Sequence, residues 1–138
     1  THLTFGFNFN QKIEKNVFPK SLTHLTYGYN YNQEIEKNVL PKSLTHLTFG
    51  DGFYQDIEKN ILPKSLTHLT FGHYFSQEIE KEVLPQSLTH LTLNNLNRDI
   101  ADSLKYASSN NYAIDNSTDI ITLEGDSCLD IHLFKNLY

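Results

Sequence analysis

Five histidines recur at a fixed step of 22 residues, each inside a Thr-His-Leu-Thr segment. An imidazole can act as a general base, can ligate Zn²⁺ through a ring nitrogen, and can exchange hydrogen bonds with a bound partner. A row of equally spaced imidazoles therefore raises three alternatives, which are a catalytic site, a metal ladder and a binding surface. The histidines of this row are His2, His24, His46, His68 and His90.

Catalysis and metal binding both need groups that the repeated segment does not supply. A serine precedes each segment, but no acid recurs behind each histidine, so a Ser-His-Asp arrangement is not indicated. A straight row offers two imidazoles to one ion, and no nearby carboxylate or thiolate completes a zinc site. We therefore expect no enzyme and no cofactor, and the His-ladder metal site is the weakest alternative. The stronger ones are a surface residue copied by duplication and hydrogen bonding to a partner.

The histidines belong to an internal repeat. Four full units of 22 residues cover residues 1–88, and a shortened fifth unit continues to residue 100. In each unit apolar residues alternate with polar ones around the histidine, which predicts a short strand with one solvent-facing side. Glycine follows the strand, and a proline ends the segment before the next unit. Such units bury their apolar positions only by stacking, so the sequence predicts a solenoid.

The predicted fold class is an α/β repeat, a solenoid like that of leucine-rich repeats. Leu22, Leu25 and Tyr27 follow the L-x-x-L-x-L strand pattern, and Ile35 and Val39 form an i, i+4 pair typical of a helical turn. We expect a short-stranded parallel sheet on the concave face and short helical or 3₁₀ segments and loops on the convex face. An inward aromatic spine is expected at the ninth position of the units, formed by Phe9, Tyr31, Phe53 and Phe75.

An apolar-Pro pair before each strand and an aromatic-Gly pair after it punctuate the units. One unit shows the pattern in Leu40-Pro41, Ser43-Leu44, Leu47, Phe49-Gly50, Phe53 and Ile57. This pattern closely resembles the FNIP repeat, and the resemblance covers residues 1–100. FNIP repeats are known from social amoebae and giant viruses. Several viral members carry an F-box ahead of the array, which implies a substrate-recognition arm of a ubiquitin ligase, with ligase components as partners. No F-box is visible in this sequence.

Residues 101–138 depart from the repeat and are predicted to form a closing cap of helix and strand. Residues 99–107 have the pattern of a helix with Asn97 as its N-cap and with Ile100 and Leu104 inward. Residues 119–123 match a further strand, followed by Gly125. The expected organisation is thus a repeat domain over residues 1–100 and a cap over residues 101–138.

The strand face and the loop after it form the candidate partner-binding surface. Adjacent parallel strands lie about 4.8 Å apart, so the repeated side chains should stack in columns on the concave face. The loop positions after the strand differ most between units, and exposed aromatic residues are typical interface anchors; neutral drift is the alternative explanation. The concave-face candidates are His24, Thr26, His46, Thr48, His68, Thr70, His90 and Thr92. The rim candidates are Phe7, Tyr29, Asp51, His73, Tyr54 and Tyr74.

Stacked imidazoles should resist protonation. Like charges about 4.8 Å apart repel by roughly 1 kcal/mol per pair in water and by more near a protein surface. No acid is placed on the strand face to offset this repulsion. We therefore expect the central His46 and His68 to have pKa values below the usual value of about 6.5.

The amino-acid composition favours a protein partner over nucleic acid or membrane. The net charge is −5, and the eleven Lys and Arg are mostly interleaved with acids, which argues against nucleic-acid and membrane partners. One cysteine, Cys128, and the lack of a signal-like apolar run favour a cytoplasmic location, which is the host cytoplasm for a viral protein. The predicted function is a non-enzymatic module that binds a protein partner through the concave sheet and its rim. A structural spacer or assembly array is the alternative.

Overall fold

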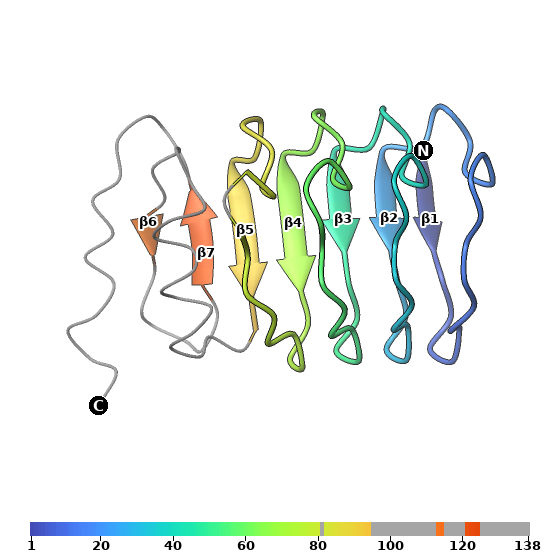
Figure 1. The fold of residues 1–138 in the computed structure, drawn as a ribbon, viewed down its shortest axis with the longest axis horizontal. Coiled ribbons are helices and arrows are strands. Elements are labelled where there is room, and N and C mark those ends of the chain that lie inside the picture. Colours follow the sequence, from blue (N-terminus) through green and yellow to red (C-terminus); the bar gives the residue numbers. More distant parts are fainter. Residues whose placement is uncertain (81, 95–112, 115–120, 125–138) are drawn as a thin grey trace.

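One sheet of short strands runs the length of the molecule (Figure 1). The computed structural model describes residues 1–80, 82–94, 113–114 and 121–124. Within these ranges the strands are β1 His2–Thr4, β2 His24–Thr26, β3 His46–Thr48, β4 His68–Phe71, β5 His90–Leu93, β6 Ala113–Ile114 and β7 Ile121–Glu124.

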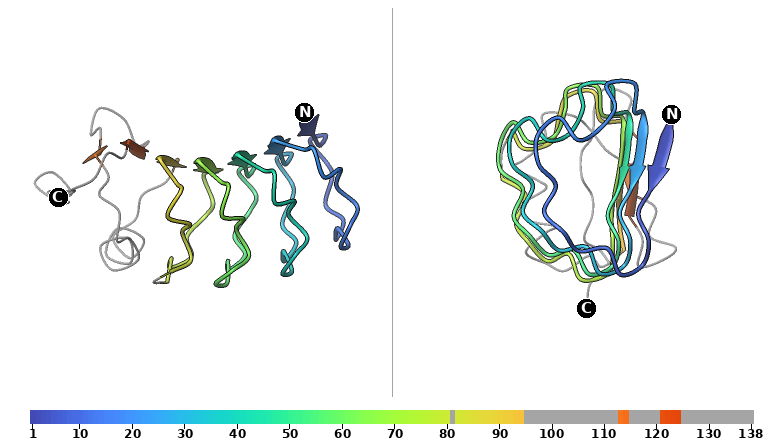
Figure 2. Two further views of the ribbon diagram at one scale, coloured as in Figure 1. Left: turned by 90° about the horizontal axis from the view of Figure 1, so that it is seen from above. Right: turned by 90° about the vertical axis from the view of Figure 1, so that its right-hand side faces the viewer.

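The first five strands are parallel and stay in one register. Each histidine pairs with the histidine of the next unit, and each leucine and threonine does the same. The order in the sheet is β1-β2-β3-β4-β5-β7-β6. Figure 2 shows the strands along one side and the loops along the other, where successive coils spread more widely. The sheet therefore lines the inner side of the curve, and the predicted parallel-sheet solenoid is confirmed.

Tight turns, and no helix, connect the strands within the described residues. In the second coil three turns close through backbone hydrogen bonds, from Tyr31 to Gly28 (3.2 Å), Val39 to Glu36 (3.3 Å) and Leu44 to Pro41 (3.1 Å). Asn38 has a φ of 66°, which lies in the left-handed region. A left-handed residue ends helical backbone, so the helical or 3₁₀ segment expected around Ile35 and Val39 is not confirmed.

The core is a double column of aromatic rings flanked by leucine columns. Phe49 and Phe53 stack within one coil with ring centroids 4.0 Å apart, and Phe53 meets Phe75 of the next coil at 6.3 Å. Phe53 is 0% exposed, whereas Phe9 of the first coil is only partly buried. The aromatic spine predicted at the ninth position therefore points inward.

Polar side chains of the repeat join each coil to the one before it. The Ser43 hydroxyl donates to the carbonyl oxygen of Leu22 at 2.6 Å, and Ser65 repeats the bond to Leu44. The Asn32 backbone N–H donates to the Asn10 side-chain oxygen at 2.9 Å. These contacts span 21 or 22 residues, so much of the polar periodicity serves coil stacking.

The last two strands of the sheet are antiparallel, unlike the five parallel strands of the repeats. β7 pairs with β5 in the antiparallel sense, and β6 pairs antiparallel with β7. The strand expected over residues 119–123 overlaps β7, but its direction reverses that of the repeat. The helix expected over residues 99–107 lies outside the described residues, and the division at residue 100 stays a prediction. Across the described part of the chain, no helix has the length and apolar character to span a bilayer.

Phe53→Ala tests the aromatic spine. Phe53 contacts rings in its own coil and in both directions along the stack, so its loss should leave a cavity that costs about 3–5 kcal/mol of unfolding free energy. Urea unfolding followed by circular dichroism measures the change. Tyr54→Ala is the matched control, because Tyr54 is 53% exposed. Equal stability of Phe53→Ala and the parent would refute the inward assignment.

Glu82→Asn tests the left-handed turn. Asn16, Asn38 and Asn60 occupy this position in the first three coils, and Glu82 adopts the same backbone with a φ of 70°. Asparagine tolerates this conformation better than glutamate does, so the exchange should stabilise the protein by about 0.5–1 kcal/mol. Glu80→Asn in the same loop should give no such gain. A lower melting temperature for Glu82→Asn than for the parent would contradict this prediction.

Candidate functional site

The repeated histidines form a continuous stack on the solvent-facing side of the sheet. His24 and His46 have ring centroids 4.1 Å apart and planes inclined by 11°, and the same spacing continues through His68 to His90. His2 joins the stack at 3.9 Å from His24. Sequence analysis predicted this column from the 22-residue step, and the threonine column runs beside it in the same register.

A threonine contacts each imidazole from His24 to His90. The hydroxyl oxygen of Thr45 lies 2.9 Å from His46 Nδ1 and 3.1 Å from the carbonyl oxygen of Thr23 in the preceding coil. Sequence reasoning missed these positioning residues, although an invariant threonine before each histidine was the available signal. The threonines in contact with a histidine ring are Thr23, Thr45, Thr67 and Thr89.

The other ring nitrogen, Nε2, is not engaged by the described part of the protein. Within the described residues Nδ1 of each stacked histidine from His24 to His90 contacts its threonine, and Nε2 makes no hydrogen bond to the protein. A neutral imidazole offers one donor and one acceptor. The concave face therefore presents a row of unengaged Nε2 atoms with the coil spacing.

The environment of the stack disfavours charge. Burial lowers the pKa of His46, and repulsion from His68 and the other stacked histidines lowers it further. Burial and the neighbouring imidazoles likewise lower the pKa of His24 and His68. The direction agrees with the sequence-based expectation, and burial is the largest single cause of each shift, ahead of repulsion from any one neighbouring imidazole.

The stack does not converge on an ion. Neighbouring rings such as His46 and His68 are nearly parallel, at 11°, so their in-plane lone pairs point the same way. In the described ranges no three His, Cys, Asp or Glu side chains are grouped as metal ligands. The geometry thus suits hydrogen bonding along a surface better than chelation.

The rim where the strands end carries exposed aromatic rings. Phe7 and Tyr29 stack with centroids 4.8 Å apart and planes within 6°, and they are 63% and 37% exposed. The hydroxyl of Tyr74 raises the pKa of Tyr29, so Tyr74 lies beside it across the intervening coil. Asp51, in that coil, accepts a hydrogen bond from the His73 backbone N–H at 2.9 Å.

The structure thus unites part of the predicted rim. Phe7, Tyr29 and Tyr74 gather along one edge, and we call these three residues the aromatic rim. Asp51 supports the backbone of the next coil and is already engaged. Tyr54 is 53% exposed but makes no ring contact within the described residues, so it stands apart from the aromatic rim.

The parallel coils and their stacked columns define a leucine-rich-repeat-like solenoid. The family model for the FNIP repeat matches residues 1–30, 9–52 and 53–96. The chain therefore belongs to the FNIP repeat family, which confirms the resemblance seen in the Leu-Pro and aromatic-Gly punctuation.

A solved structure supports the same class. A crystal structure of CroV588, described as a novel circular LRR protein structure, is 61% identical to the chain with a TM-score of 0.68. The match covers 69% of this chain and 14% of that chain. This chain therefore corresponds to a small part of the length of CroV588. No curated protein matches the chain.

The depressed histidine pKa values predict acid-sensitive stability. A histidine whose pKa is lower in the folded state binds fewer protons than it does in the unfolded chain. The free energy of unfolding should therefore fall as the pH drops below about 6.5 and level off below the folded pKa values. Urea unfolding at several pH values between 7.5 and 4.5 measures this fall.

A double variant separates the stack from other titrating groups. His46→Gln/His68→Gln should lose less stability between pH 7.5 and pH 5 than the parent does, because two of the resisting imidazoles are absent. NMR titration of the imidazole C–H resonances gives the pKa values directly. Titration of His46 and His68 at or above the value in the urea-unfolded chain would contradict the stacked arrangement.

Proposed function

We propose that this chain is a non-enzymatic module that binds a protein partner through the concave sheet face and the aromatic rim. The observation that carries the proposal is the exposed Phe7–Tyr29 ring stack in the turns that follow the strands bearing the histidine column. The fold does not need these rings for its core, which the aromatic spine already fills. Large exposed aromatic side chains are the residue types that anchor protein interfaces.

The histidine column adds a polar recognition element to the same surface. Its Nε2 atoms are unengaged among the described residues, and their rings are held rigidly by the threonines. A rigid group loses little side-chain entropy when a partner binds. We therefore expect the aromatic rim to supply contact area and the histidine column to supply register along the coils. Nucleic acid and membrane are not the proposed partners, since the net charge is −5.

An assembly array is the second candidate function. CroV588 is described as circular, and stacked repeats of this family are suited to forming an arc. A pure spacer, however, needs no exposed aromatic residues that differ between units, which favours binding. The narrower form of the proposal, a ubiquitin-ligase recognition arm in the host cytoplasm, rests on family resemblance and requires an F-box in the same protein.

Affinity capture from a cell extract tests the proposal. The variant Phe7→Ser/Tyr29→Ser/Tyr74→Ser removes the aromatic rim, and we expect it to lose a specific bound protein at least tenfold, the scale of a single interface hot spot. Val17→Ser is the matched control, because Val17 is 62% exposed outside the rim. Thermal unfolding verifies that the variants fold.

The capture result also separates the candidates. Loss of one partner in the rim variant and its retention in the Val17 control support recognition at the rim. The same protein list from the parent, the rim variant and the control would exclude the rim as a binding surface. Partners lost only in His46→Gln/His68→Gln would move recognition to the histidine column.

A further inference from the structure

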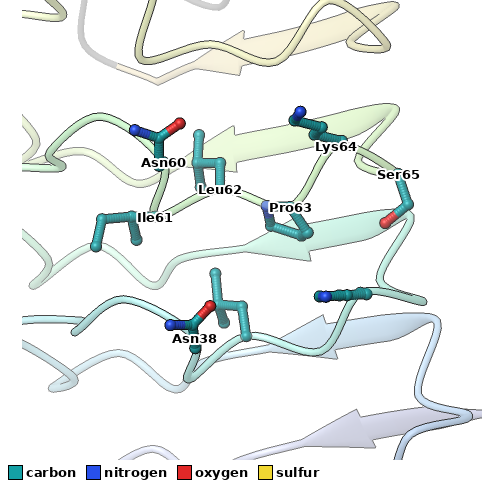
Figure 3. Close-up of a pocket in the computed structure, with 9 residues that line it drawn as sticks. Asn38, Asn60, Ile61, Leu62, Pro63, Lys64 and Ser65 are labelled. Carbon is teal, nitrogen blue, oxygen red and sulfur yellow. The ribbon is translucent and has the colours of Figure 1, made fainter.

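A groove of about 350 Å³ lies between the second and third coils, along the segments that return the chain to the start of the next strand (Figure 3). The groove is formed by two copies of the same segment, the Asn-x-Leu-Pro-Lys-Ser stretch that leads into β3 and into β4. The site is thus built by repetition, like the histidine column, but from a different part of the unit.

Two lysines line the groove, and neither has an ionic partner. Lys42 and Lys64 are exposed and make no ion pair within the described residues. By contrast, Lys12 pairs with Glu36, and Lys37 lies 3.8 Å from Glu58. Unlike Lys12 and Lys37, Lys42 and Lys64 have ammonium groups that no carboxylate of the described residues engages.

The rest of the lining is apolar or amide. Leu40 and Leu62 are 5% and 6% exposed, and the edges of their side chains form the floor of the groove. Asn38 and Asn60 stand at one end, and Figure 3 shows Lys64 and Ser65 toward the other end, near the start of the strand. No carboxylate lines the groove. The combination suits a ligand with a negative head and an aliphatic body.

The units differ at this site in charge. The first three units carry Asn and Lys at the two polar positions, whereas the fourth unit carries Glu82 and Gln86. Between the third and fourth coils, Glu82 therefore places a carboxylate where the other units have an asparagine amide, and Gln86 places an amide where they have a lysine ammonium. The groove between the second and third coils consequently combines two ammonium groups without a competing acid.

We propose that this groove binds an acidic peptide segment through one carboxylate side chain flanked by aliphatic residues. Lys42 and Lys64 occupy the same position in adjacent coils, so their flexible side chains can converge on the two oxygens of one carboxylate. The aliphatic neighbours of that residue cover the floor of Leu40 and Leu62. This inference is independent of the proposed function, because none of the residues that line the groove belongs to the histidine column or to the aromatic rim.

Peptide titration monitored by methyl NMR tests the groove. The probe is acetyl-Leu-Glu-Leu-amide, and its partner probe is acetyl-Leu-Gln-Leu-amide, which has the same shape and no charge. We expect the Glu peptide to shift the methyl resonances of Leu40, Ile61 and Leu62. The Gln peptide should bind about fivefold more weakly, the scale of two exposed charge pairs.

Matched variants isolate the two lysines. Lys42→Gln/Lys64→Gln introduces the residue that the fourth unit already has at this position, Gln86, and should remove the preference for the Glu peptide. Lys15→Gln/Lys59→Gln makes the same change in net charge on exposed residues outside the groove and should keep that preference. Sodium acetate serves as the simple-anion probe and should bind more weakly than the Glu peptide.

Three outcomes would overturn the inference. The first is equal affinity of the Glu and Gln peptides for the parent protein. The second is the same loss in both lysine variants, which would mean that only overall charge matters. The third is equal affinity of acetate and the Glu peptide, which would show a simple anion site without the aliphatic contact.

Discussion

Stacking of each residue on its equivalent in the next coil is the constraint on which the structure depends. The carbonyl oxygen of Thr23 accepts hydrogen bonds from the backbone of Thr45 at 2.9 Å and of His46 at 3.0 Å, and the parallel register repeats this pattern. The backbones approach so closely that a Cβ at Gly28 or Gly50 would collide with the glycine of the coil before it. Gly28 and Gly50 are therefore required by contact between coils, and no described glycine has a positive φ.

Like-on-like stacking also decides which side chains the columns tolerate. Rings, amides and hydroxyls can stack on copies of themselves, as the aromatic spine and the Asn8–Asn30 bond show. Fixed like charges in a column would repel by roughly 1 kcal/mol per pair even in water. Like charges that do recur at one position, such as Lys42 and Lys64, are exposed, and other charges pair diagonally between coils, as Lys12 does with Glu36. Histidine is titratable but can still stack on its copies, because the lowered pKa values of His24, His46 and His68 favour the neutral imidazole.

The 22-residue periodicity predicts the structural features that every unit shares. It does not predict features that depend on the backbone conformation of one residue or on segments outside the repeat. The parallel strands, the inward ring of Phe53 and the histidine column all follow from the 22-residue step. The spacing of Ile35 and Val39 also fits a helical turn, but the left-handed Asn38 selects a tight turn. The reversed direction of β7 has no counterpart in the repeats. The contact of Thr45 with the preceding coil and the position of Lys42 in a groove between coils depend on how the coils pack. The residue types alone do not predict that packing.

Exchange of phenylalanine for tyrosine has different consequences at inward and at exposed positions of the repeat. The second unit carries tyrosine where the first carries phenylalanine, at an inward position, Tyr27, and at a rim position, Tyr29. The Tyr27 hydroxyl is buried without a hydrogen-bond partner among the described residues, and burial raises its pKa. An unsatisfied buried hydroxyl costs about 1–3 kcal/mol. The Tyr29 hydroxyl lies at the surface beside Tyr74 and carries no such cost. Variation at inward positions is therefore restrained by the cost of burying a polar group, while variation at the rim is free of that restraint.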